Sequence, residues 1–262
     1  MIGYAVWTSV AEPAFAATEG IAAAIPQAAK SLIPLFLISL VLVNALAVTA
    51  ITNERDGRSL DLLLATDLSP KEFVFGKLGG VFWVTGMMVL APILLAGLAW
   101  WRGSMSGENL CFVTGGLIVM NVFVSVLGLH CGMRYANTRT AISVSLGTVF
   151  FLFLGVITCI VMMISFSGSF QVQLAPFMAF ILGGGVGLYL ALGVRNPSKA
   201  ILTASLLLPF FTFYAITSFL MENNLSVFIV TACSYGFATA AMLVPALYEF
   251  DFAMGRTAAA DG

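Results

Sequence analysis

Charge is scarce in this chain. Charged side chains make up only 9% of its 262 residues, whereas 60% of the residues are hydrophobic. A soluble domain needs roughly 25% charged residues to cover its surface. The shortage excludes a soluble enzyme, a nucleic-acid-binding protein and a disordered linker. We therefore predict an all-α, polytopic helical membrane protein that has no nucleic-acid partner.

Cysteine and histidine are scarce as well. The four cysteines, Cys111, Cys131, Cys159 and Cys233, are widely spaced and form no C-x-x-C pair, and His130 is the only histidine. This pattern argues against a metal cluster and against a disulfide framework. We expect no metal and no other cofactor. The cysteines are interpreted as small residues that fill helix interfaces, because free cysteine is usually buried.

Long apolar runs are abundant. A membrane-spanning helix needs about 20 mostly apolar residues. By this measure the sequence predicts seven spans: Ser31–Ile51, Leu78–Trp101, Leu110–Leu129, Thr140–Phe166, Phe177–Val194, Ala200–Phe219 and Leu225–Tyr248. The fifth is the weakest, because it is short and because Gly183, Gly184, Gly185 and Gly187 lower its helix propensity while they permit close packing.

The positive charges predict an orientation. Nine of the eleven Lys and Arg residues fall on one side of the predicted spans, and only Lys30 and Arg102 fall on the other. Positive charge concentrates in cytoplasmic loops. We therefore expect the C-terminus in the cytoplasm, the N-terminus outside, and the protein in the cytoplasmic (inner) membrane of the cell. Trp100 and Trp101 lie at the outer end of the second span, as an aromatic belt would.

Residues 1–30 are predicted to be an extracytoplasmic segment that precedes the transmembrane domain, residues 31–262. Ala14-Phe15-Ala16 resembles a signal-peptidase site, but no basic residue precedes Lys30, so a signal peptide is disfavoured. An alternative is that residues 1–30 are the outer loop after a missing first span. We expect that span upstream of Met1 or on a separate fragment.

The one substantial cytoplasmic element is the loop at residues 52–77, which holds nine of the 23 charged residues. Gly57 permits a sharp change of direction after the first span. Ser59 can cap a short helix over the leucine-rich stretch that follows. Ser69 then begins the next helix, with Pro70 at its first position and Glu72 completing a capping box.

The leucines of this loop need burial. Leu60, Leu62, Leu63, Leu64 and Leu68 would each gain about 1.5–3 kcal/mol on leaving water. They must pack on the helix bundle, lie in the lipid interface or dock on another protein. A simple lipid-binding helix would carry an excess of Lys and Arg, which this loop lacks.

The loop resembles that of a known family, the membrane subunits of type 2 ATP-binding-cassette (ABC) exporters. In that family a span ends in a pattern like E-R-[DE]-x-G-T-L-[ED]-x-L-L-x-[ST]-P-[LI]-[ST], followed by G-K at the next span. This chain has Glu54-Arg55-Asp56-Gly57, Leu60-Asp61, Leu63-Leu64, Thr66-Asp67-Leu68-Ser69 and Gly76-Lys77. The resemblance covers roughly residues 31–165 and includes Asn137-Thr138-Arg139-Thr140-Ala141.

The resemblance implies that the loop is a coupling helix, which in the family sits in a groove of the ATPase subunit. The residues implied in this role are Glu54, Arg55, Asp56, Gly57, Leu60, Asp61, Leu63, Leu64 and Leu68. The sequence departs from the family at Gly57-Arg58-Ser59 and at Asp67, where a Gly-Thr pair and a proline are usual. The family also usually has six spans, with the coupling helix between the second and third.

The resemblance thus implies an exporter permease without catalysis of its own, whose partners are an ATPase subunit, a second permease copy or homologue, and membrane lipid. The chain has no G-x-x-x-x-G-K-[ST] motif, because Leu78 follows Gly76-Lys77. One alternative is an ion- or proton-coupled transporter, which only the glycines at 183–187 favour. The other is an intramembrane enzyme, but no ionisable acidic or basic group falls in the middle of a span, and His130 and Cys131 would point about 100° apart on a helix.

Polar residues within the spans are the candidate lining of a transport path, although hydrogen bonds between helices are the commoner role of such residues. The largest are Asn44, Asn121, Thr148, Tyr189, Tyr214 and Tyr235. Two G-x-x-x-G patterns, Gly128–Gly132 and Gly183–Gly187, predict close helix packing. The sequence does not define the substrate.

Overall fold

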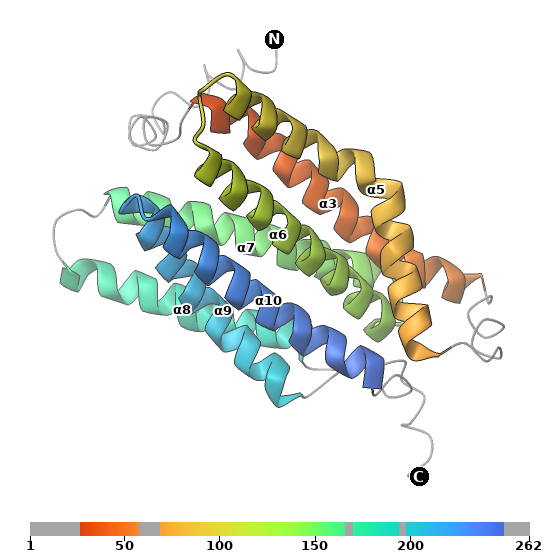
Figure 1. Cartoon of the computed structure of the whole chain (residues 1–262). Helices are drawn as coiled ribbons and strands as arrows, with labels where there is room; N and C mark the ends of the chain where they lie inside the picture. The colour runs from red at the N-terminus through yellow and green to blue at the C-terminus, as the bar shows by residue number, and fades with distance from the viewer. Residues whose placement is uncertain (1–26, 58–68, 166–169, 194–197, 249–262) are drawn as a thin grey trace, which may run out of the picture.

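The structure, a computed structural model, describes residues 27–57, 69–165, 170–193 and 198–248. Short turns aside, this described part of the chain is helical. It comprises α3 (Gln27–Asp56), α5 (Pro70–Trp101), α6 (Gly107–Arg134), α7 (Thr138–Ser165), α8 (Phe170–Leu192), α9 (Lys199–Leu220) and α10 (Asn224–Tyr248) (Figure 1). The predicted all-α fold, with a helix at each of the seven apolar segments, is confirmed.

Six of these helices are long and apolar enough to cross a membrane, judged over the described residues. A helix satisfies its backbone hydrogen bonds internally, which is why apolar runs of this length become helices in lipid. The exception is α8, whose apolar part, Phe177–Leu192, is shorter than the six. The chain is therefore a multi-pass membrane protein with six long spans, and the fifth predicted span is the weak one.

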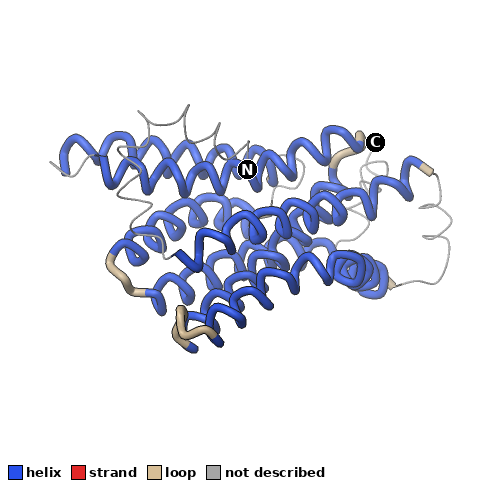
Figure 2. The backbone as a smooth tube through the Cα atoms, turned by 90° about the horizontal axis from the view of Figure 1, so that it is seen from above, coloured by secondary structure: helices blue, strands red, loops and turns tan. Residues whose placement is uncertain are grey.

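Each helix runs antiparallel to the helix before it in the chain (Figures 1 and 2). At one end of the bundle α3, α6, α8 and α10 finish and α5, α7 and α9 begin. We call this the loop end, because the connection between α3 and α5 leaves from it. We call the opposite end, where the α5–α6 and α9–α10 turns lie, the far end.

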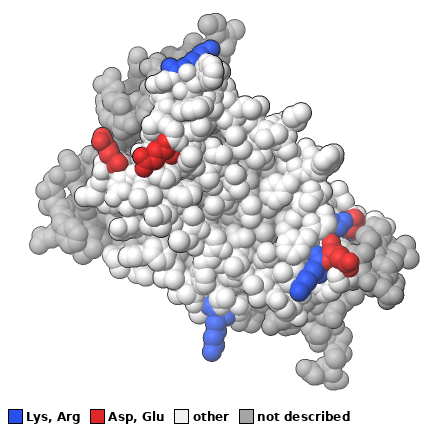
Figure 3. Space-filling view, in the orientation of Figure 1, with Lys and Arg blue, Asp and Glu red and all other residues white. Residues whose placement is uncertain are grey.

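Among the described residues, charge lies at the ends of the bundle. In the face shown in Figure 3, Lys, Arg, Asp and Glu gather at the two ends, and the band between them is uncharged. Between the ends of α5, large apolar side chains are exposed, among them Trp83, Met87 and Leu94. An uncharged, apolar surface of this kind suits the hydrocarbon core of a bilayer.

Helix α6 lies at the centre of the bundle, where it packs on α3, α10, α7 and α5. From Met120 to Met133 its side chains are buried on nearly every face, with Val122 the exception. The side chains of α6 therefore fill the middle of the bundle.

One of the two G-x-x-x-G predictions is confirmed. A Cβ atom on Gly128 would lie 2.6 Å from the Asn44 carbonyl oxygen, and one on Gly132 would lie 3.0 Å from that of Val48. These two glycines let α6 approach the backbone of α3. The second prediction is wrong in register: Gly183 and Gly187 face open space, and it is Gly184 and Gly185 that contact α9.

The predicted start of the second span is also confirmed. Ser69 Oγ accepts a hydrogen bond from the Glu72 backbone N–H at 3.3 Å, and Glu72 Oε2 accepts one from the Ser69 N–H at 2.9 Å. This reciprocal pair is a capping box, with Pro70 in the first turn. It fixes where the chain re-enters the bundle after the loop.

Two of the four cysteines occupy the predicted environment. Cys131 and Cys159 are buried between helices, whereas Cys111 and Cys233 are exposed on the surface of the bundle. The interpretation of all four as interior filling residues is therefore half right. The proposals for residues 1–26, including the cleavage site, fall outside the described residues.

Candidate functional site

The last turn of α3 joins three other helices through three consecutive side chains, Glu54, Arg55 and Asp56. Successive residues of a helix point about 100° apart, so three in a row can reach three different neighbours. Glu54 forms an ion pair with Lys77, in the second turn of α5. The two ends of the connection between α3 and α5 are thereby tied together beside the bundle.

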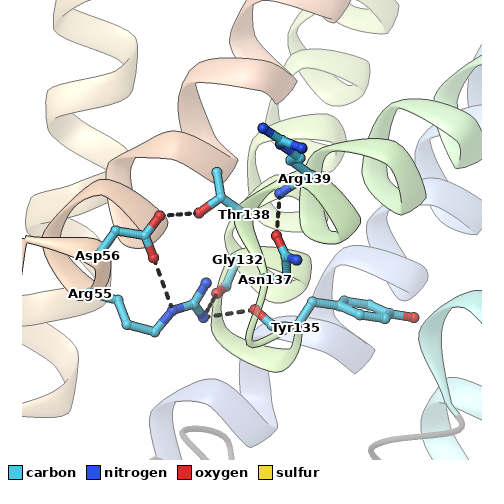
Figure 4. A network of polar contacts seen from close by, with 7 residues as sticks. All are labelled: Arg55, Asp56, Gly132, Tyr135, Asn137, Thr138 and Arg139. Carbon is cyan, nitrogen blue, oxygen red and sulfur yellow. Dashed lines mark hydrogen bonds and ion pairs between the residues drawn. The ribbon is translucent and has the colours of Figure 1, made fainter.

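Arg55 reaches across to the end of α6. Its Nη1 donates to the backbone carbonyl oxygens of Gly132, at 3.1 Å, and Tyr135, at 2.7 Å (Figure 4). The last carbonyl groups of a helix have no partner within the helix and carry partial negative charge. The Arg55 guanidinium supplies both a hydrogen-bond donor and a positive charge for these carbonyl groups. Arg55 of α3 therefore caps the end of α6.

Asp56 completes the set by contacting the start of α7. The Thr138 hydroxyl donates to Asp56 Oδ2 at 2.5 Å, and Arg55 Nε lies 3.9 Å from Asp56 Oδ1 (Figure 4). Asn137 caps the same helix, since its Oδ1 accepts from the Arg139 backbone N–H at 3.0 Å. A carboxylate at a helix N-terminus is favoured by the helix dipole.

The connection continues from α6 to α8. The Tyr135 hydroxyl donates to the Ala191 carbonyl at 2.9 Å, and His130 Nε2 lies 3.2 Å from the Leu192 carbonyl oxygen. On the other flank, the Lys71 ammonium of α5 lies 5.6 Å from the ring centre of Tyr248 in α10. Polar contacts at the loop end therefore involve α3, α5, α6, α7, α8 and α10.

The predicted coupling residues fall into two groups. Glu54, Arg55, Asp56 and Gly57 are described, and Gly57 ends the helix with its N–H bonded to the Asn53 carbonyl at 2.9 Å. The short amphipathic helix predicted after them stays a prediction, because its residues Leu60, Asp61, Leu63, Leu64 and Leu68 lie outside the described residues. In the predicted loop at residues 52–77, residues 52–56 belong to α3 and residues 70–77 to α5, so the chain leaves α3 at Gly57, directly after the three side chains that join the helices.

The six candidate path residues do not gather in one place. Asn44 is fully buried and joins three helices, since its Nδ2 donates to the Val124 carbonyl at 2.8 Å and its Oδ1 accepts from Ser145 Oγ at 2.9 Å. Asn121 and Thr148 are buried and donate to carbonyls of their own helices.

The three tyrosines are spread over three helices. Tyr235 is buried and lies edge-on to Phe123, with ring centres 5.0 Å apart. Tyr189 packs over Gly193, which directly follows α8, and Tyr214 is 51% exposed on the surface of α9. Asn44 has the role of an interhelical hydrogen-bonding residue, and the six residues do not line a common cavity in the described part of the chain.

Sequence reasoning missed the partners of the charged run. Lys77 belongs to the positive charges of the loop and to a Gly-Lys pattern, and Thr138 belongs to the segment Asn137–Ala141, but neither pattern indicates a pairing partner. Gly132 and Tyr135 offer backbone carbonyls that no side-chain pattern reveals. The opposite charges of Glu54 and Lys77 at the two ends of one loop are the signal that could have indicated their pairing.

A scan against protein-family models, a search of curated proteins and a search of solved structures find no match to this chain.

Proposed function

We propose that this chain is the transmembrane subunit of a type 2 ABC exporter, coupled through the loop at residues 52–77 to a separate ATPase subunit. The observation that carries the proposal is the position of Glu54-Arg55-Asp56. The three residues that match the family pattern stand at the base of the loop and also join α3 to α5, α6 and α7.

This arrangement supports coupling in physical terms. Energetic coupling between distant sites travels through packed side chains, hydrogen bonds and rigid helices that move together. A force applied to the loop would act first on the end of α3. Because Arg55 and Asp56 bond to the ends of α6 and α7, those helices would follow, rather than the loop bending alone.

The filled centre of the bundle supports a second part of the proposal. Because α6 occupies the middle, a transport path through one copy would have to displace buried side chains such as Phe123 and Leu127. We infer that the path forms between two permease subunits, either two copies or this chain and a homologue. The loop end then faces the cytoplasm, in agreement with the excess of Lys and Arg there.

The alternative of an ion- or proton-coupled transporter loses its one supporting observation. The glycines at 183–187 would suit the broken helices of such transporters, but α8 continues without interruption from Phe170 to Leu192. For an intramembrane enzyme, His130 and Cys131 would need to act together. Instead, His130 contacts the α8 carbonyl of Leu192. Because the sequence has no G-x-x-x-x-G-K-[ST] motif, we assign ATP hydrolysis to the proposed partner subunit.

The proposal is tested by co-purification with the ATPase subunit encoded nearest to this chain's gene. Replacing Leu63 and Leu64 together with Asp should abolish retention of the ATPase subunit while the permease still inserts. Ala136→Asp is the matched control, because Ala136 is exposed in the α6–α7 turn at the same end of the bundle. Undiminished retention in the double variant would contradict the coupling assignment.

A further inference from the structure

A pocket of about 450 Å³ opens at the far end of the bundle, away from the loop. It lies between the first halves of α6 and α10 and is closed by Phe36 of α3, the α5–α6 turn and Phe219 of α9. Sites for small molecules usually enclose about 300–1,000 Å³. Neither the charged run of α3 nor any candidate path residue lines it.

The pocket is elongated along the helices. Its lining follows α6 from Asn109 to Met120. At a rise of 1.5 Å per residue these eleven steps cover about 16 Å. This is about half the thickness of the hydrocarbon core, which is about 30 Å. The pocket therefore extends from one membrane surface to about the midplane, a length that suits a single hydrocarbon chain.

Polarity changes along this length. At the mouth, Asn224 Nδ2 donates to Asn109 Oδ1 at 3.0 Å, while the Asn109 NH₂ and the Asn224 carbonyl oxygen bond to none of the described residues. Phe36, Leu117 and Met120 line the deeper part together with Thr231, and none of the lining residues is Lys, Arg, Asp or Glu. The mouth thus offers a donor and an acceptor without charge.

Two adjacent glycines create the space. The Phe228 ring occupies the place of a side chain on Gly115, 2.7 Å from where its Cβ would stand, and stacks on Phe112 with ring centres 5.4 Å apart. Gly116 lines the pocket, and a Cβ placed there would meet nothing within 4 Å. The lack of a side chain at Gly115 therefore lets the Phe228 ring form one wall of the pocket, and the lack of one at Gly116 leaves the interior open.

We propose that this pocket binds an uncharged amphiphile: one hydrocarbon chain in the apolar part, and a hydroxyl, ester or amide headgroup at the Asn109–Asn224 mouth. The site is separate from the proposed coupling function. Its occupancy can be measured on the full-length chain without an ATPase subunit.

The test uses a photoactivatable monoacylglycerol added to the purified chain in mild detergent, with peptide mapping of the labelled residues. We expect labelling in α6 and α10, and weaker labelling by a fatty acid of the same chain length, whose carboxylate meets no Lys or Arg among the residues that line the pocket. Gly116→Leu should lower labelling of α6 and α10 about tenfold, equivalent to 1.4 kcal/mol. Leucine also favours helix over glycine, so the substitution should not unfold α6.

Val113→Phe fills the pocket from a second position and should have the same effect. Gly236→Leu is the control, because Gly236 lies on α10, faces open space and does not line the pocket. A neutral lipid that co-purifies with the wild type and is lost from Gly116→Leu would support the site and identify the membrane as the source. Probe labelling without such a lipid would support the site with an external amphiphile. Equal labelling of the wild type and both filled variants would overturn the proposal, as would stronger labelling by the fatty acid.

Discussion

The two ends of the bundle hold their helices together in different ways. At the loop end, Glu54, Arg55 and Asp56 bond to three other helices, and Tyr135 extends the contacts to α8. At the far end, the Asn109–Asn224 hydrogen bond joins α6 and α10 beside an open pocket. A closely bonded end can transmit a displacement to several helices, whereas a loosely bonded end can open. The difference fits a protein that receives force at one end and accommodates a ligand at the other.

Removal of the Arg55 side chain at the loop end should have the largest effect on stability. Arg55→Ala leaves two carbonyl groups at the end of α6 without their charged donor, and hydrogen bonds to charged groups contribute about 1.5–3 kcal/mol. We expect a loss of that size in the free energy of unfolding, measured by denaturant in mild detergent. Arg102→Ala, at an exposed position of the far end, is the control and should change stability little. Equal effects of the two substitutions would remove the distinction between the ends.

Stability should be nearly as sensitive to a side chain added at Gly128, where α3 and α6 approach closely. A Cβ on Gly128 would stand 2.6 Å from a backbone oxygen that cannot rotate away. Overpacking of this kind costs about 1–3 kcal/mol. Gly128→Ala should therefore lower the unfolding temperature, whereas Gly236→Ala, which faces open space, should leave it unchanged or raise it. A stable Gly128→Ala protein would show that the helices can separate at no cost.

Substitution of Asn44 should have a smaller effect on stability. This substitution also distinguishes a structural role of Asn44 from a role in lining the transport path. Interhelical hydrogen bonds in membrane proteins contribute about 0.6 kcal/mol on average and up to about 1.7. Asn44→Ala removes two of them and should destabilise the protein by about 1 kcal/mol. Thr148→Ala, whose hydroxyl bonds within its own helix, should be nearly neutral. Impaired transport by an Asn44→Ala protein of unchanged stability would favour the path-lining role instead.

The smallest effect is expected at the far end. Asn109→Ala removes one exposed hydrogen bond between α6 and α10, so the cost should fall below about 0.6 kcal/mol. The unfolding measurement used for Arg55→Ala checks it directly. A loss as large as that of Arg55→Ala would mean that the far end is held as tightly as the loop end.

The sequence predicted the helices well and their contacts poorly, for a physical reason. The length of an apolar run is set by the thickness of the bilayer, so helices such as α9 and α10 can be located within a few residues. The capping box at Ser69 is equally local. By contrast, the partners of Arg55 lie 77 and 80 residues away along the chain, and only the packing of α3 against α6 brings them together.

The glycines illustrate the same limit. Both G-x-x-x-G patterns had the spacing of a packing site, and only Gly128–Gly132 is one. On α8 the contact with α9 falls one residue along, at Gly184 and Gly185. Spacing fixes which residues share a face of a helix, whereas the rotation of that helix toward its neighbour depends on the rest of the bundle.

The most direct test of the central claim is the rate of ATP hydrolysis by the complex of this chain with the ATPase subunit proposed as its partner. The informative variant is Arg55→Lys, because lysine keeps the charge but lacks the planar fork that reaches two carbonyl groups. The account predicts that Arg55→Lys retains the ATPase subunit yet hydrolyses ATP only at the rate of the isolated subunit, whereas the wild-type complex differs from that rate. A variant complex that hydrolyses ATP at the wild-type rate would contradict transmission through the end of α3.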